Sequence, residues 1–406
     1  APMLLTYRAV GSSTGQKEFV GQATNGWRSY NHFGAGDIPM SQTRYNSLTS
    51  GSEMVHLPFA LGAIGVFHRV PNDKLGGASL SLSACLLAKI FSGAVTTWDD
   101  AAVKAENPGM TVPAGQLIKV AHRTLGSSST GGLAGYLNKK CPASWNLGTG
   151  STIQLWPTSA GFTAVQGSPG MQSFLQSTDY SIGYLDAGHG HGLGLSEVAL
   201  TNAAGQTRTS REAIALGGVA DAGAQGVSAS AFPSSATADW SAVNLFDMPG
   251  ANTWPIVLVS YLYVKKDQTA TNSRTAAALQ AFIDMILSNR GGILQEFGFT
   301  APPSSLRTQT QAAAATIVYP GGMVSFAWET DTAPYTGMGE NIISSKRHAF
   351  DDYERDVLRA ELVALKAQLG TVAVASTPTP APAAAEEDGG VDAGLIVSII
   401  ALVISL

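Results

Sequence analysis

Charged residues are scarce in this sequence of 406 amino acids, of which 13% are Asp, Glu, Lys or Arg. The net charge is −5, and no basic cluster is denser than Lys265-Lys266 or Lys346-Arg347-His348. A broad face for nucleic acid would need many more positive charges, so we expect no nucleic-acid partner. A local anion site stays compatible with this balance, because backbone N–H groups and one buried arginine can form it.

Cysteine is equally rare, with only Cys85 and Cys141 in the chain. The count alone leaves two readings open, a pair of buried free thiols or a disulfide. No signal peptide is visible before the strand-like sequence that begins at Ala1. We therefore expect either that processing has removed one or that the chain as given lacks its true beginning.

A continuous apolar run of about 20 residues, the length that spans a bilayer as a helix, is also missing. The final segment, residues 391–406, is apolar but shorter. It follows residues 371–390, a Pro- and Ala-rich tether that would hold the body away from a surface. We expect this tail to contact a membrane or a membrane-protein partner, as a truncated span, an uncleaved lipid-anchor signal or a packed apolar helix.

Strand-like and helix-like segments alternate through residues 1–306, which favours α/β layers with a largely parallel sheet in each lobe. The strand-like runs are Leu4–Val10, Ala63–Val70, Leu117–Ala121, Ser181–Leu185 and Ile256–Val264. The helix-like runs are Gln16–Thr24, Ser83–Phe91, Gly131–Lys140 and Ser273–Ser288, the last with Ala277, Leu279, Phe282, Ile283 and Ile286 on one face.

The character of the chain changes after residue 306. Residues 307–347 are polar, with one strand candidate at Met323–Trp328. Residues 348–369 then form a charged amphipathic helix in which leucines recur at helical spacing, namely Leu358, Leu362, Leu365 and Leu369. This pattern covers about three heptads, so self-association through residues 348–369 and a packed surface helix are both open.

Three loops of small residues precede or follow predicted elements and could hold an anion. They are Gly11–Gly15, Phe33–Asp37 and Arg123–Thr130. Glycine and serine at a helix N-terminus leave backbone N–H groups free for an anion, and arginine adds a fixed charge with forked donors. Ordinary helix capping is the alternative for each loop taken singly.

Asp37 is unusual in such a site because a carboxylate repels an anion unless the anion carries a proton. A buried acceptor would accept hydrogen phosphate and leave sulfate without a hydrogen bond. The loops therefore favour a ligand that is both tetrahedral and protonated.

Two other kinds of site have weaker support. Gly11–Gly15 fits the G-x-S-x-G nucleophile elbow, which would make Ser13 the nucleophile of a serine hydrolase. However, no downstream histidine has an obvious acid partner. His189 and His191 lack a third metal ligand nearby, so a flexible exposed loop is the simpler interpretation and no metal is expected.

The ordered motifs of residues 4–306 resemble the phosphate-binding receptors of ABC phosphate uptake systems and the DING proteins of the same superfamily. The motifs are Tyr7–Ser13, Phe33–Pro39, Ile90–Gly93, Thr97–Asp100, Asn107–Gly109, His122–Arg123, Gly148–Thr152, Ser181–Tyr184 and Trp254–Ile256.

The resemblance implies a two-lobed, periplasmic-binding-protein-like (type II) fold with two crossover strands, near His56–Ala60 and Ala251–Ile256. Lobe I would comprise residues 1–58 and 253–306, and lobe II residues 59–252. The extension at 307–370, the tether and the tail would follow. The resemblance also implies a disulfide between Cys85 and Cys141, and with it an oxidising, extracytoplasmic compartment.

Carried over position by position, the family's ligand set implies phosphate binding without bond chemistry or cofactor. The residues are Ser12, Asp37, Arg123, Ser127, Ser128 and Ser129.

Three departures from the family pattern favour an alternative, a structural subunit of a surface assembly that has lost ligand binding. The family's opening strand and first ligand loop have no counterpart before Leu4, so they lie upstream or a strand such as Met323–Trp328 replaces them. Leu125 stands where an aspartate usually pairs with the arginine. Ser128 replaces a glycine.

Overall fold

The structure is a computed structural model that describes residues 6–8, 10–21, 29, 31–48, 53–289, 292–329, 341–343 and 350–370. Its helices are α1 (Ser12–Val20), α2 (Gln42–Tyr45), α3 (Ala84–Phe91), α4 (Ala101–Glu106), α5 (Ser128–Lys140), α6 (Gly167–Ser177), α7 (Ala187–Gly192), α8 (Ser210–Ala215), α9 (Gly218–Ser228), α10 (Ser273–Leu287), α11 (Ile293–Glu296), α12 (Ser304–Ala314) and α13 (Phe350–Gly370). Its strands are β1 (Phe33–Gly36), β2 (Met54–His68), β3 (Lys119–Arg123), β4 (Phe162–Val165), β5 (Ser181–Asp186), β6 (Ser196–Glu197), β7 (Leu200–Thr201), β8 (Thr207–Arg208), β9 (Leu245–Phe246), β10 (Ile256–Lys265), β11 (Ala327–Trp328) and β12 (Ile342–Ile343).

The other predicted strands and helices match observed elements, but the predicted strand Leu4–Val10 is wrong at its described residues 6–8, which form no strand, and β2 begins at Met54 rather than Ala63. Helix α1 begins earlier than expected, at Ser12. The predicted strand Leu4–Val10 lies partly outside the described residues.

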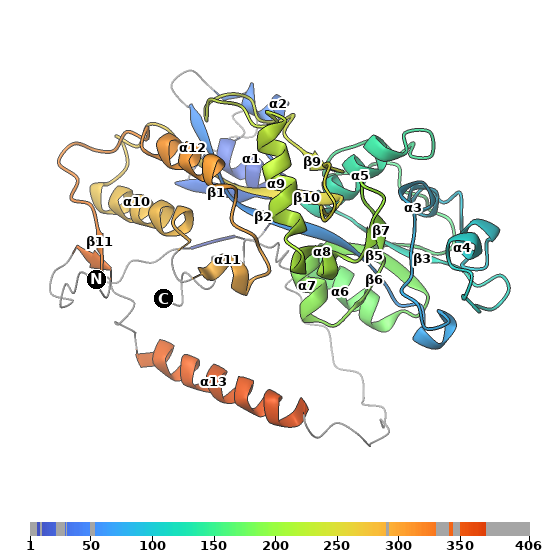
Figure 1. The fold of residues 1–406 in the computed structure, drawn as a ribbon. Coiled ribbons are helices and arrows are strands. Elements are labelled where there is room, and N and C mark those ends of the chain that lie inside the picture. Colours follow the sequence, from blue (N-terminus) through green and yellow to red (C-terminus); the bar gives the residue numbers. More distant parts are fainter. Residues whose placement is uncertain are drawn as a thin grey trace.

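Strand β2 joins two halves of the main sheet, whose order is β1-β10-β2-β5-β3-β4 (Figure 1). Its first part pairs antiparallel with β10, up to Ala63 opposite Val257. From Ile64 onward it pairs with β5 instead. The partner therefore changes between Ala63 and Ile64, further along the strand than the predicted crossover at His56–Ala60.

The expectation of a largely parallel sheet in each lobe is wrong for the half that holds β1 and β10. Both β1–β10 and β10–β2 are antiparallel, because β2 and β10 cross between the halves in opposite directions. Parallel pairing occurs in the other half, where β3 lies between β4 and β5.

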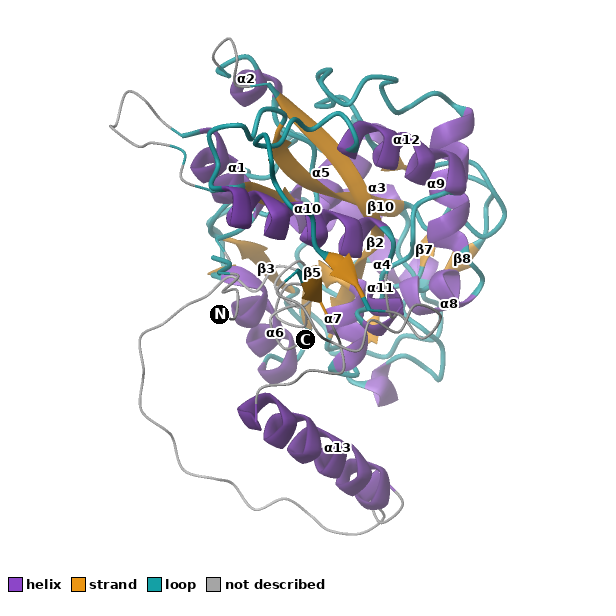
Figure 2. Cartoon of the chain, turned by 90° about the vertical axis from the view of Figure 1, so that its left-hand side faces the viewer, coloured by secondary structure: helices purple, strands orange, loops and turns teal. Residues whose placement is uncertain are grey.

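Helices cover both halves of the sheet. In the half with β10, α10 packs its apolar face against β2 and β10, and Ala277, Leu279, Phe282, Ile283 and Ile286 are all buried, as their spacing predicts. Figure 2 shows α10 and α12 over these strands. In the other half, Cys85 of α3 and Cys141 at the end of α5 form a disulfide with a Cα–Cα distance of 5.2 Å.

The packed body of the protein extends beyond residue 306. The predicted boundary between the body and the C-terminal extension falls inside α12, whose inner face is buried. Leu306, Thr310 and Ala313 are buried, and the Thr310 hydroxyl donates to the carbonyl of Pro58 on β2 (3.2 Å). The expectation that Met323–Trp328 fills a strand position in the main sheet is wrong. Only Ala327–Trp328 is strand, and it pairs with β12 in a separate sheet.

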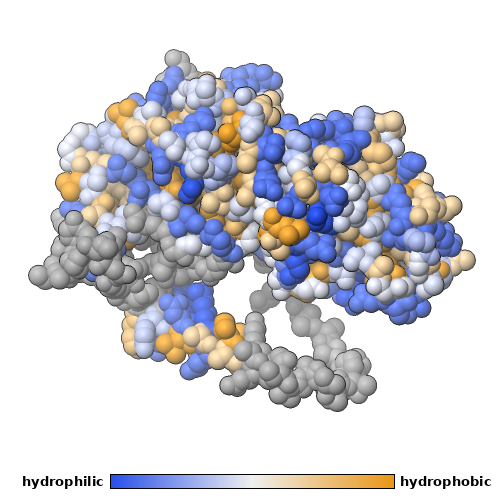
Figure 3. All heavy atoms as spheres, viewed as in Figure 1, coloured by the Kyte–Doolittle hydropathy of each residue, from blue (hydrophilic) through white to orange (hydrophobic). Residues whose placement is uncertain are grey.

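Helix α13 matches the predicted amphipathic helix, and both ribbon views place it apart from the body (Figures 1 and 2). Its surface mixes apolar and charged patches (Figure 3), and Leu358, Leu362 and Leu365 are exposed. Self-association through residues 348–369 stays a prediction. Among the described residues, no helix has the length and apolar character needed to cross a bilayer. The tether and the tail, residues 371–406, lie outside them.

Candidate functional site

The three loops of small residues meet at one pocket between the halves of the sheet. All six predicted ligand residues line it, namely Ser12, Asp37, Arg123, Ser127, Ser128 and Ser129. The cavity has a volume of about 30 Å³, where one water needs about 10–15 Å³. The space therefore suits one small polyatomic ion rather than a sugar or a peptide. Sequence reasoning missed three further polar lining residues, Ser168, Asp186 and Ser260.

Three helices direct their N-termini to this pocket. Helix α1 begins with Ser12, α5 begins with Ser128 after its N-cap Ser127, and Ser168 lies in the first turn of α6. The first N–H groups of a helix have no intrahelical acceptor, and the helix dipole adds positive potential there. Three such ends around one cavity make it attractive to an anion.

Gly11, before α1, has φ 75°, a backbone angle that other residues adopt only under strain. Helix α1 is then fixed by the buried side chain of Gln16. Its amide donates to the carbonyl of Pro39 (2.8 Å) and to the hydroxyl of Tyr263 (3.1 Å). These bonds hold α1 against the loop after β1 and so place Ser12 beside Asp37.

Asp37 follows β1 and is 6% exposed. Its carboxylate accepts hydrogen bonds from Ser260 of β10 (2.8 Å) and from Ser128 of α5 (3.1 Å). Its backbone N–H donates to the hydroxyl of Ser12 (3.5 Å). The bond from Ser128 joins the two halves of the fold directly across the pocket. Each oxygen of the Asp37 carboxylate therefore accepts one hydroxyl hydrogen bond.

Arg123 is the last residue of β3 and is 5% exposed. Its guanidinium donates to the hydroxyl of Ser168 (Nη1, 3.4 Å), and its backbone N–H donates to the hydroxyl of Tyr184 (3.2 Å). The carboxyl end of a strand in an open α/β sheet is where ligands commonly bind. Leu125, at the position where the resemblance implies an aspartate, is 52% exposed.

Asp186 adds a second carboxyl group to the pocket. It ends β5, opposite Ile64 of β2, and accepts a hydrogen bond from the backbone N–H of His189 (3.3 Å). Burial and then the charge of Asp37 raise the pKa of Asp186 well above its usual value. The pocket therefore contains two carboxyl groups and one guanidinium.

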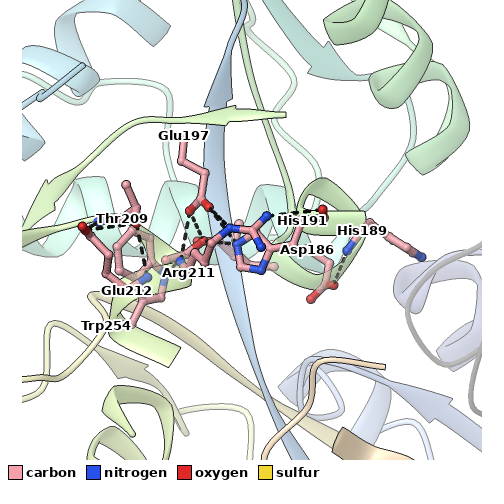
Figure 4. A network of polar contacts seen from close by, with 10 residues as sticks. Asp186, His189, His191, Glu197, Thr209, Arg211, Glu212 and Trp254 are labelled. Carbon is pink, nitrogen blue, oxygen red and sulfur yellow. Dashed lines mark hydrogen bonds and ion pairs between the residues drawn. The ribbon is translucent and has the colours of Figure 1, made fainter. Parts of the chain in front are cut away.

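The contacts of Ser13 do not support the interpretation of this residue as the nucleophile of a serine hydrolase. Its hydroxyl accepts a hydrogen bond from Arg44 (3.2 Å), and a guanidinium cannot act as a general base. A different serine, Ser210, does contact His191 (3.0 Å). His191 also contacts Glu197 (2.9 Å), as Figure 4 shows. Ser210 is 0% exposed, so no substrate can reach it, and the serine and the acid share one ring nitrogen.

The expectation of a flexible exposed loop at His189 and His191 is wrong. Both lie on the short helix α7, partly buried, and Figure 4 shows His191 facing Glu197. Arg211 contacts the same carboxylate (3.6 Å). No cluster of three or more potential metal ligands occurs in the part of the chain that the structure describes.

Comparison with known proteins places the chain in a family. A model of the PBP superfamily domain matches residues 1–290, well over half of the chain. The chain belongs to the PBP superfamily.

Individual relatives match a similarly large part of the chain. The phosphate-binding protein PstS of Xylella fastidiosa is 28% identical over 316 residues, 76% of each chain. PstS of Haemophilus influenzae is 28% identical over 310 residues, 74% of this chain and 81% of that one. PstS 3 of Mycobacterium leprae is 26% identical, with 77% and 79% covered.

Solved structures of PBP superfamily members share the fold. A periplasmic phosphate-binding protein, PfluDING, has a TM-score of 0.57 at 20% identity and covers 76% of this chain and 87% of its own. The phosphate binding protein of Stenotrophomonas maltophilia has the same TM-score and identity, with 77% and 88% covered. These likenesses support the two-lobed type II architecture.

Proposed function

We propose that this chain is an extracytoplasmic solute-binding protein that holds one inorganic phosphate ion in the pocket between its halves. One observation carries the proposal: three helix N-termini, a buried arginine and a buried carboxylate meet around a cavity of ionic size. The relatives named phosphate-binding proteins support it. No covalent chemistry is required of any residue.

Each half supplies a different part of the recognition. Ser12 and Asp37 lie in the half with β1 and β10, whereas Arg123 and Ser127 to Ser129 lie in the half with β3. An ion in the pocket contacts both halves only when they are close together. Closure is then favoured by the contacts that the closed form alone provides.

The ligand set favours phosphate over sulfate. Arg123 and the helix N-termini would neutralise the charge of either ion. Asp37 distinguishes them, because hydrogen phosphate has a proton to donate to a buried carboxylate and sulfate has none. The same carboxylate next to sulfate would remain an unpaired charge.

The compartment follows from two observations. A disulfide between Cys85 and Cys141 is typical of oxidising environments. PfluDING, with which this chain shares its fold, is a periplasmic protein. We place the protein outside the cytoplasm and propose attachment to a membrane or a membrane-protein partner through residues 391–406.

Isothermal titration of the whole chain with phosphate and with sulfate tests the function. We expect one phosphate per chain and no measurable heat with sulfate. Arg123→Ala should weaken phosphate binding by about 30-fold or more, since it removes the charge that faces the ion. Arg307→Ala, on α12, is the matched control and should bind as the original does. A folded protein that does not bind phosphate contradicts the proposal.

A further inference from the structure

Asp186 is a buried carboxyl group that lines the ligand pocket, and the family's ligand set does not include it. It is 8% exposed and stands where β5 ends and α7 begins, opposite the residue at which β2 changes partner. Figure 4 shows its carboxylate turned toward the backbone of His189. Asp37 enters the same cavity from the other half of the fold.

The other groups around Asp186 provide little compensating positive charge. Strands β2 and β10 contribute Gly62, Ile64, Leu258 and Ser260 to the pocket, none of them charged. Helices α5 and α6 contribute serines, and the loop after β1 contributes Asp37. On α7 itself, burial lowers the pKa of His189, which favours its neutral form. Among the described lining residues, Arg123 alone carries positive charge.

Two carboxylates and a doubly charged anion around one guanidinium would be strongly repulsive in a buried site. Protonation of one acid relieves this repulsion. Asp37 already accepts hydrogen bonds from the hydroxyls of Ser128 and Ser260. Among the described residues, the donors to Asp186 are backbone N–H groups, and burial outweighs them in raising its pKa.

We propose that the pocket holds phosphate together with two protons, one directed at Asp37 and the second shared between Asp186 and the ion. Asp186 thereby becomes a residue that selects for ligands that can share a second proton. This inference rests on the proposed function, because it concerns how the same ion is recognised.

The proposal predicts a proton dependence that an asparagine cannot reproduce. An amide donates a similar hydrogen bond but has no titrating proton. The phosphate affinity of the original protein should be highest at pH values where Asp186 of the ligand-free protein is protonated. It should fall as the pH rises through the pKa of Asp186. The loss is up to tenfold for each pH unit, as expected when a complex retains one proton more than the free protein.

Phosphate titrations of the original chain, Asp186→Asn and Asp186→Ala between about pH 5 and pH 9 test this linkage. The informative quantity is the ratio of the phosphate affinity of the original chain to that of Asp186→Asn. The ionisation of phosphate itself affects both affinities equally and therefore cancels in this ratio. We expect this ratio to fall with pH and Asp186→Ala to bind at least tenfold more weakly than Asp186→Asn. Asp179→Asn, an exposed carboxylate of the same half, is the matched control with a constant ratio.

The outcomes separate the inference from the function. A ratio that is constant with pH overturns the inference, because an amide without a titrating proton would then reproduce the behaviour of Asp186. A ratio that rises with pH, or equal affinities of Asp186→Asn and Asp186→Ala, overturns the inference while phosphate binding stands. Absence of phosphate binding by the original chain at every pH contradicts the proposed function itself. Thermal unfolding of each variant checks that it is folded.

Discussion

Asp37 and Ser128 come from opposite halves of the fold and are joined by a hydrogen bond of 3.1 Å across the pocket. Asp37 follows β1, and Ser128 begins α5. The carboxylate that would accept a proton from the ligand therefore also connects the two halves. In the proposed function, ligand recognition and closure would both depend on this side chain.

Removing this connection should weaken ligand binding. Ser128→Ala loses a hydrogen bond to a charged acceptor, and we expect phosphate affinity to fall about tenfold. Isothermal titration measures the change, with Ser177→Ala on the outer surface of α6 as the control. Unchanged affinity in Ser128→Ala would show that the bond contributes nothing to the closed, loaded form.

Asp37→Asn should change the selectivity between phosphate and sulfate while leaving the folded structure largely unchanged. The amide can donate to sulfate, whereas the carboxylate repels it, so we expect the preference for phosphate over sulfate to narrow by at least about tenfold. Competition titrations with both ions measure this preference. If the affinities for phosphate and sulfate fall equally, Asp37 shapes the pocket but does not distinguish protonated from unprotonated ions.

Asp186→Asn should stabilise the protein at neutral pH in the absence of ligand. The pKa of Asp186 is raised in the folded state, so its carboxyl group favours folding at low pH and this contribution is lost as the pH rises through that pKa. We expect a melting temperature at least about 2 °C higher at pH 7 and little difference near pH 3. An equal increase in melting temperature at both pH values would exclude the raised pKa of Asp186 as its cause.

The disulfide between Cys85 and Cys141 should stabilise the half that contains α5. It closes a sequence separation of 56 residues, and such cross-links contribute about 2–4 kcal/mol. We expect Cys85→Ala/Cys141→Ala to unfold at lower denaturant concentration while still binding phosphate. A double variant as stable as the original would mean that strain offsets the effect of the cross-link.

Much of the fold and part of the site follow from the sequence. Apolar runs such as Ile256–Val264 and the spaced apolar face of α10 locate elements because burial imposes their periodicity. The direction of β2 relative to β10 does not follow from such patterns, because strand pairing depends on contacts between segments far apart in the chain. The parallel sheet expected in that half was wrong for this reason.

Of the pocket residues that sequence reasoning missed, Ser260 lies within a predicted strand, Asp186 directly follows one, and Ser168 lies in no predicted element. Ser260 is a single polar residue in the middle of an apolar strand, and a buried hydroxyl there needs a partner, which is Asp37. Asp186 closes a buried strand at its carboxyl end, where ligand sites commonly form. Both signals are present in the sequence. They indicate one site only once the structure shows that β5, β10 and α5 meet at the same pocket.

The central claim is that one phosphate ion occupies the space between Asp37 and Arg123. A crystal structure of the whole chain grown with saturating phosphate tests it most directly. We predict tetrahedral density within hydrogen-bonding distance of the Arg123 guanidinium, the Asp37 carboxylate and the N–H groups that begin α5. A well-ordered structure with that space empty, or filled by neighbouring side chains, would contradict the account.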